Sequence, residues 1–144
     1  MSEPIRRILA VDFGDARTGL AATDWTGSIV VPLGRIDARD DAAVVAAVRE
    51  LVLERQTQVV VLGMPLTLDG TPGQRAQRTA GFRERLAAAL PCPVEAVDES
   101  HSTDEAHERL KAGGLKAKRR KDLADSVAAM VILERYRDDL RRRR

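Results

Sequence analysis

The first part of the chain alternates short apolar runs with turns. The runs cover Ile5 to Asp12, Thr18 to Thr23 and Ser28 to Ile36. Apolar runs this short, joined by glycine-containing turns, are typical of strands in an antiparallel meander. Pro32 interrupts the third run, and proline cannot donate a hydrogen bond to a neighbouring strand. We therefore expect the third strand to lie at an edge of the sheet or to carry a bulge.

The pattern then changes to alternating helices and strands. Asp40 or Asp41 is expected to cap a helix that runs to Gln56. The apolar face of this helix consists of Val44, Val45, Val48, Leu51 and Val52. The continuous apolar run from Thr57 to Gly63 predicts a strand with both faces covered. The remaining predictions are a helix over 74–90, a strand over 94–98, a helix from Ser102 or Thr103 to Lys111, and a helix over 121–139.

The order of these elements predicts an α/β fold. Antiparallel strands at the N-terminus, joined to parallel strands that follow crossover helices, form a mixed central sheet with helices on both faces. We expect a single domain over residues 1–139, because neither an internal repeat nor a long linker divides the chain. Residues 140–144 form a basic tail that we expect to be disordered.

Charge and cysteine content narrow the possible environments. The formal net charge is +2, yet the isoelectric point is about 9.0 and positive charge gathers late in the chain, which points to a polyanionic partner. Cys92 is the one cysteine, so no disulfide can form within the chain. We expect a cytoplasmic protein, because no signal peptide is visible and no apolar run approaches the roughly 18–20 residues that span a bilayer.

Three acidic residues are candidates for chemistry. Asp12 ends the first apolar run, Glu99 follows the strand over 94–98, and Asp125 lies inside the last predicted helix. Each also has an ordinary explanation: a turn-forming acid beside Gly14, a solvated acid at a strand end, and an acid paired with Lys121. If the fold gathers the three carboxylates, a divalent cation must neutralise them. Paired Mg²⁺ or Mn²⁺ ions held by carboxylates are the machinery of phosphodiester cleavage.

The surroundings of the later acids leave two choices open. Asp125 shares a helical stripe with Ala128, Ala129 and Ile132, whose small size would let the helix approach a sheet closely. Asp122, one turn earlier, is the alternative ligand. On the preceding strand, alternation places Asp98 and Glu99 on opposite faces, so only one of them would point toward Asp12.

Basic residues near these acids are candidates for phosphate contact. Five positive charges lie in an expected loop before the last helix, at Lys116, Lys118, Arg119, Arg120 and Lys121. Arg17, close to Asp12 in sequence, is a further candidate. The alternative is that the basic loop is merely solvated. Since aromatic residues make up only 3% of the chain, we expect recognition of backbone and shape rather than a base-stacking platform.

Four motifs, in this order, resemble those of one bacterial family. They are residues 11–21 (VDFGDARTGLA), Gly63-Met64-Pro65-Leu66 followed by Gly70, Val97-Asp98-Glu99 with Ser102-Thr103, and Asp125-Ser126-Val127-Ala128-Ala129. The chain is similar over residues 5–138 to the YqgF-type pre-16S rRNA nucleases, also called the RuvX-type Holliday-junction-resolvase-like family. The resemblance implies an RNase H-like fold and a metal-dependent nuclease that matures the 5′ end of 16S rRNA.

The resemblance also assigns roles to residues. It places the catalytic acids and the ligands of Mg²⁺ or Mn²⁺ at Asp12, Glu99 and Asp125. In a two-metal arrangement Asp12 would bridge ions roughly 4 Å apart, with Glu99 and Asp125 each holding one. The expected partner is pre-16S rRNA or another structured or branched nucleic acid, bound by a monomer or a homodimer, with no membrane involved.

Other functions remain open from the sequence. Family members usually have arginine after the second acid, whereas Ser100-His101 follows Glu99 here. This departure favours a non-catalytic RNA-binding assembly factor as one alternative. A Holliday-junction or branched-DNA resolvase is a second alternative. Asp12-Phe13-Gly14 also fits the phosphate loop of actin-like or sugar kinases, but those close two domains over ATP, and 144 residues supply only one.

Overall fold

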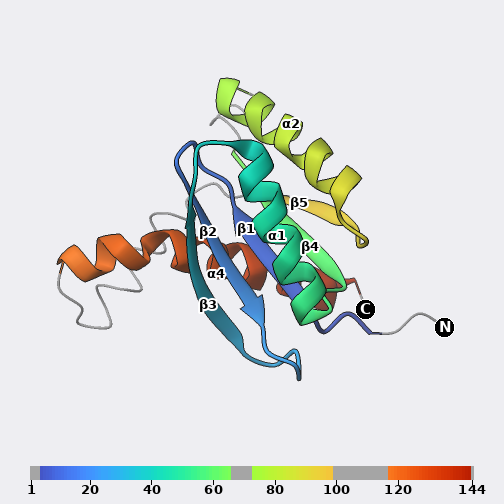
Figure 1. The fold of residues 1–144 in the computed structure, drawn as a ribbon. Coiled ribbons are helices and arrows are strands. Elements are labelled where there is room, and N and C mark those ends of the chain that lie inside the picture. Colours follow the sequence, from blue (N-terminus) through green and yellow to red (C-terminus); the bar gives the residue numbers. More distant parts are fainter. Residues whose placement is uncertain (1–3, 66–72, 99–116, 144) are drawn as a thin grey trace.

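A computed structural model describes residues 4–65, 73–98 and 117–143, and of residues 117–125 it describes the backbone only. The elements are β1 (Ile8–Asp12), β2 (Arg17–Thr23), β3 (Val30–Asp37), α1 (Asp41–Arg55), β4 (Val59–Met64), α2 (Gln74–Ala89), β5 (Val94–Asp98) and α4 (Ala117–Arg142) (Figure 1). These elements match the predicted ones closely in type and order. The helix predicted from Ser102 or Thr103 to Lys111 lies outside the described residues.

The strands form one mixed sheet in the order β3-β2-β1-β4-β5. β2 pairs antiparallel with both β1 and β3. β4 pairs parallel with both β1 and β5. The predicted α/β fold with an antiparallel N-terminal part and parallel later strands is therefore confirmed, and β1 is its central strand.

The prediction for Pro32 is confirmed in both of its forms. β3 lies at an edge of the sheet, and its register against β2 shifts by one residue. Leu20 lies opposite Gly34, but Ala21 lies opposite Pro32, so Leu33 is the extra residue of a bulge. Gly34 has a φ of +83°, a conformation that residues with a Cβ rarely adopt, which explains why glycine follows the bulged residue.

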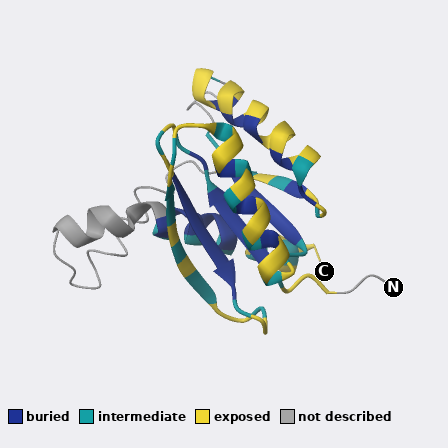
Figure 2. Ribbon diagram, in the orientation of Figure 1, coloured by how far each residue is buried: buried dark blue, intermediate teal, exposed yellow. Residues whose placement is uncertain are grey.

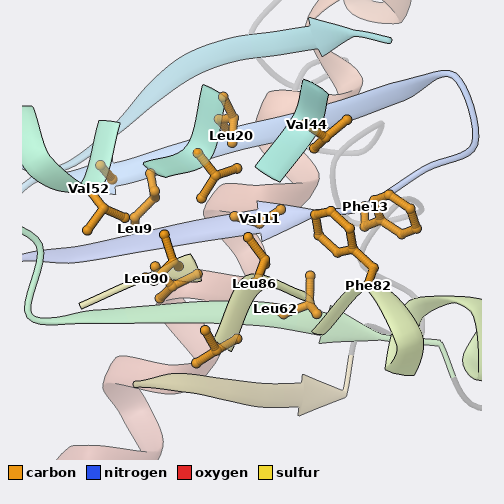
Figure 3. Packing of buried hydrophobic residues seen from close by; sticks show 14 residues of the cluster. Leu9, Val11, Phe13, Leu20, Val44, Val52, Leu62, Phe82, Leu86 and Leu90 are labelled. Carbon is orange, nitrogen blue, oxygen red and sulfur yellow. The ribbon is translucent and has the colours of Figure 1, made fainter. Parts of the chain in front are cut away.

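Helices cover both faces of the sheet, as predicted. One face packs against α1 and α2 through a cluster centred on Leu9, Val11, Leu62, Phe82 and Leu86 (Figure 3). The other face packs against α4 through Ile8, Ala10, Ala21, Ala129 and Ile132. Figure 2 shows the buried strands beneath α1 and α2, whose outer sides are exposed. No helix among the described residues is both long and apolar enough to cross a membrane.

The ends of the first and last helices follow from local chemistry. Asp40 caps α1, where its side chain accepts a hydrogen bond from the backbone N–H of Ala42 at 3.2 Å. α4 continues to Arg142, so residues 140–142 are helical where a disordered tail was expected. Arg141 pairs with Asp138 and Arg142 with Asp139, at 3.6 and 3.9 Å. Basic residues in a last helical turn are favoured by the helix dipole, which explains the extension.

Candidate functional site

Asp12 lies at the carboxyl end of the central strand. It is half-buried and stands opposite Gly19 on β2. Ile8 and Ala10, two and four residues earlier, pack against α4, and side chains alternate along a strand. Asp12 therefore belongs to the face of the sheet that α4 covers. Carboxyl ends of strands in open α/β sheets are the usual location of ligands, so the position predicted for Asp12 suits chemistry.

The turn after Asp12 is held tightly against the sheet. A Cβ atom on Gly14 would run into the backbone carbonyl oxygen of Arg17, so only glycine fits this position without a shift of the turn. Phe13 points to the opposite face from Asp12 and stacks on Phe82 of α2, with ring centroids 3.9 Å apart and planes inclined by 7° (Figure 3). The two residues that follow Asp12 are thus fixed, which limits the freedom of movement of its backbone.

Arg78 of α2 provides a second anchor for this turn. Its guanidinium donates to Asp15 at 2.7 Å and to Asp41 at 3.3 Å, and it lies 5.1 Å from the centre of the Phe13 ring. The hydrogen bond to Asp15, followed by the charge of Asp41, raises the pKa of Arg78 above its usual value. Asp15 is largely exposed, so these pairs add little to stability. They tie the β1–β2 turn to both helices of that face.

Arg78 is a residue that sequence reasoning missed. Its contact with Asp15 joins residues 63 positions apart. Within α2 it is one of several arginines, and no spacing distinguishes it from Arg75, Arg83 or Arg85. The Asp15 side chain, which belongs to the opening family-like motif, is therefore used for anchoring the turn.

Ser126 positions α4 over the same end of the sheet. Its buried hydroxyl donates to the backbone oxygen of Leu20 at 2.8 Å and accepts from the backbone N–H of Gly34 at 3.2 Å. Leu20 stands opposite Val11, the residue before Asp12. The α4 backbone at position 126 therefore crosses the sheet beside the end of β1.

The stripe predicted for the last helix does face the sheet. Ala128, Ala129 and Ile132 have exposed fractions of 1%, 0% and 0%. Asp125 lies in α4 immediately before Ser126, and only its backbone is described. The same holds for Asp122, the alternative ligand. The structure thus fixes the residue after Asp125 against Leu20 of β2, while the direction of the Asp125 side chain stays a prediction.

β5, which β4 separates from β1, ends with Asp98 of the second acidic motif. Gly63 on β4 stands opposite Val97, and Met64 stands opposite Asp98. Val97 packs against the α4 side, whereas Met64 packs against the α1 and α2 side. Asp98 therefore belongs to the face away from Asp12, and its backbone oxygen accepts a hydrogen bond from Arg135 of α4 at 3.0 Å. Glu99 lies outside the described residues.

Only one carboxylate of the predicted trio has a described side chain, that of Asp12. Within the part of the chain that the structure describes, no group of three or more His, Cys, Asp or Glu residues is placed to hold a metal ion. The donor chemistry nevertheless suits hard cations, because carboxylate oxygens are the ligands that Mg²⁺ takes from proteins. Of the three predicted ligands, the structure describes the Asp12 carboxylate and, for Asp125, the backbone alone.

The basic candidates occupy two places at this end of the molecule. Arg17 begins β2, is exposed, and stands opposite Asp37 of β3. α4 begins at Ala117, so the predicted basic loop is wrong for Lys118, Arg119 and Arg120, which lie in the first turns of the helix before Lys121, the predicted helix start. Lysine and arginine have high intrinsic helix propensity, which favours helix here although the helix dipole opposes basic residues in a first turn. Lys116 lies outside the described residues.

Comparison with known sequences identifies close relatives. The sequence model of the RuvX family, described as Holliday junction resolvase, matches residues 6–139. A protein of Synechococcus elongatus named "Putative pre-16S rRNA nuclease" is 38% identical over 138 residues, which cover 96% of this chain and 93% of the relative. A protein of Chloroflexus aurantiacus with the same name is 40% identical, over 91% of this chain and 86% of the relative.

Comparison with solved structures shows the fold. RuvC of Thermus thermophilus in complex with a Holliday junction is 17% identical, with a TM-score of 0.53 over 85% of this chain and 89% of that chain. The Holliday junction resolvase of fowlpox virus is 16% identical, with a TM-score of 0.55 over 93% of this chain and 99% of that chain. The fold predicted from the resemblance, an RNase H-like one, is confirmed.

Proposed function

Because this chain belongs to the RuvX family, we propose that it is a nuclease that hydrolyses phosphodiester bonds of pre-16S rRNA with bound Mg²⁺ or Mn²⁺. One observation of the molecule carries the proposal. Asp12 ends the central strand on the face covered by α4, and the Ser126 hydroxyl holds the α4 turn next to Asp125 over the same strand end. This arrangement supports a shared site for acids that are far apart in sequence.

Asp12, Glu99 and Asp125 are the proposed catalytic acids and metal ligands. Val97 packs on the α4 side, so continued alternation beyond β5 would turn the residue after Asp98 toward that side. Bound divalent cations would supply an activated water and stabilise the leaving oxygen in a two-metal mechanism. The chain itself holds Asp12 in place through its neighbours Phe13 and Gly14, and Arg135 holds the backbone that precedes Glu99.

Substrate contact is proposed for the basic residues at the same end. Arg17 begins the strand that stands opposite Asp12. The basic first turns of α4, with Lys118, Arg119, Arg120 and Lys121, precede Asp125 in the same helix. Lys116 would extend this group. Contacts from such side chains to phosphate would position the backbone of the nucleic acid without reading its bases.

The family description supports a second candidate, cleavage of branched DNA, because the matching model is that of a Holliday junction resolvase. The departure at Ser100-His101 supports the non-catalytic alternative, since one expected positive charge near the substrate is missing. One assay separates the three. Purified protein with Mn²⁺ is offered a labelled RNA that carries the 5′ extension of 16S rRNA, and separately a labelled four-way DNA junction.

The Asp12→Asn variant tests the site itself. We expect its cleavage rate to fall at least about 100-fold, because a lost metal ligand removes several kcal/mol of transition-state stabilisation. Binding of the RNA should persist, since the variant has one negative charge fewer. Asp138→Asn, the same change at an exposed position of α4, is the matched control and should cleave normally. Undiminished turnover by Asp12→Asn would refute the assignment, and binding without any cleavage by the unmodified protein would favour the assembly factor.

A further inference from the structure

A large aromatic side chain is exposed at the far end of the sheet from Asp12. Trp25, the only tryptophan of the chain, lies in the turn between β2 and β3 with 63% of its surface exposed. Ile29, in the same turn, is 59% exposed. Thr23, just before this turn, contacts Ile8 at the start of β1. β1 therefore separates the turn from Asp12, by about 13 Å at ~3.3 Å per residue.

The turn that carries Trp25 is firmly held. One carboxylate oxygen of Asp24 accepts hydrogen bonds from the Thr26 hydroxyl at 2.7 Å and from the backbone N–H groups of Ser28 and Ile29 at 3.1 and 3.2 Å. These bonds, the one from Thr26 foremost, lower the pKa of Asp24 below its usual value. Gly27 has a φ of +79° and packs against Arg6 so closely that a Cβ atom at position 27 would lie within 3.0 Å of Arg6 atoms. The indole is thus presented on a preorganised turn, which reduces the entropy cost of binding.

Two arginines share a small surface pocket with Trp25. Arg7 and Arg55 line this pocket together with Asp24, and its volume of about 10 Å³ leaves no room for a side chain or base to enter. The Asp24 carboxylate is engaged by its hydrogen bonds within the turn. The Nε of Arg7 donates to the backbone oxygen of Gln56 at 2.8 Å, and an Nη of Arg55 donates to that of Thr23 at 3.2 Å. Among the described residues, no carboxylate forms an ion pair with either arginine. Each guanidinium is therefore oriented by a carbonyl and keeps further N–H donors for an anion.

We propose that this turn is a second nucleic-acid contact, which binds one unpaired nucleotide of the substrate away from the cleavage site. The base would stack on the exposed indole, and its phosphate would accept hydrogen bonds from Arg7 and Arg55. An unpaired nucleotide combines a flat π face with a negative charge, which is what these three side chains complement. The proposal rests on the proposed function only in taking a nucleic acid as the ligand.

Intrinsic fluorescence tests the contact directly, because Trp25 is the only tryptophan. The full chain, with EDTA present to prevent cleavage, is titrated with a short single-stranded RNA and with a blunt RNA duplex of the same length. Stacking on the indole should quench its emission saturably with the single strand, and much less with the duplex.

Variants assign the contact to the named residues. Trp25→Ala should weaken binding of the single strand, measured by filter retention, by about tenfold, the effect of losing one base stack. Arg55→Ala should shift the quenching curve to severalfold higher RNA concentration. The matched control for Trp25 is Leu53→Ala, because Leu53 is also a large exposed apolar side chain but lies in α1. The matched control for Arg55 is Arg49→Ala, because the Nε of Arg49 also donates to a backbone carbonyl, that of Ala89. Both controls should bind like the unmodified protein.

Four results would overturn the proposal. RNA that is retained on the filter without quenching would place all contacts elsewhere, while the proposed nuclease function would stand. Equal quenching by a polyglutamate peptide would indicate an acidic protein partner instead. A concentration-dependent blue shift in the absence of RNA would indicate contact between two copies of the chain. Failure to bind any RNA at all, together with absent cleavage, would refute the proposed function as well.

Discussion

The face of the sheet under α1 and α2 is filled by large side chains, whereas the face under α4 contains three fully buried alanines. On the first face Phe13 stacks on Phe82, among leucines and valines. On the second face Ala10, Ala21 and Ala129 meet. Small residues allow a helix to approach a sheet closely.

The acidic residues of the two sides also differ in the interactions that they make. Asp15 and Asp41, near the first face, are paired with Arg78 and hold the β1–β2 turn. Asp12 belongs to the second face, beside the α4 turn that Ser126 attaches to β2. The α1 and α2 side therefore mainly provides packing and anchoring, while the α4 side carries Asp12, the one proposed ligand whose side chain the structure describes. Three substitutions test this division.

The largest effect is expected from Phe82→Ala on the first face. The substitution removes a ring that is 1% exposed and leaves a cavity against Phe13, which should lower the free energy of unfolding by about 3–5 kcal/mol. Urea denaturation followed by circular dichroism measures this loss. Leu53→Ala, at a side chain that is 51% exposed, should change the value by less than about 0.5 kcal/mol. A loss below about 1 kcal/mol for Phe82→Ala would contradict the packing role of this face.

Ala129→Leu on the second face is expected to lower stability less than Phe82→Ala does, and also to lower the cleavage rate. Three added carbons have no space where Ala129 is fully buried, so α4 must shift, at a cost of about 1–3 kcal/mol. The shift would displace the turn that carries Asp125, and the cleavage rate should fall even under conditions where the protein stays folded. Ala43→Leu on the exposed side of α1 is the matched control. Normal cleavage by folded Ala129→Leu would argue against a site beneath α4.

The smallest effect concerns pH on the second face. Tyr136 of α4 is 5% exposed, and its burial, followed by its hydrogen bond with Glu95, raises its pKa. The folded state therefore favours the neutral phenol. This contribution is fully present below the unfolded pKa of about 10 and is lost as pH rises further, by at most about 1.4 kcal/mol per pH unit.

Urea denaturation on both sides of pH 10 measures this loss, and Tyr136→Phe should remove the dependence. Tyr136 is the only tyrosine, so phenolate absorbance reports its ionisation alone. Ionisation at the ordinary pKa, without unfolding, would show that the α4 face is more open to water than the structure indicates.

The elements themselves were predictable because their signals are local. The valine spacing of α1, the Asp40 cap and the interruption at Pro32 each depend on residues a few positions apart, and the structure confirms all three. The predicted α4 was too short at both ends, because the charged runs at Lys118–Lys121 and Arg141–Arg142 are compatible with either a loop or a helix. Helix dipole and ion pairs, which decide such ends, are weak and depend on geometry.

The sequence alone was sufficient to predict the alternation of strands and helices, the family resemblance and the inward stripe of α4, because periodicity and turn chemistry depend on residues that are close in sequence. The tertiary structure was needed to show that Asp98 belongs to the face away from Asp12, that Arg78 anchors the turn after Asp12, and that Trp25 lines one pocket with Arg7 and Arg55. These relations join residues that strand order and register bring together across the sheet. Register depends on the packing of whole faces, which no local pattern contains.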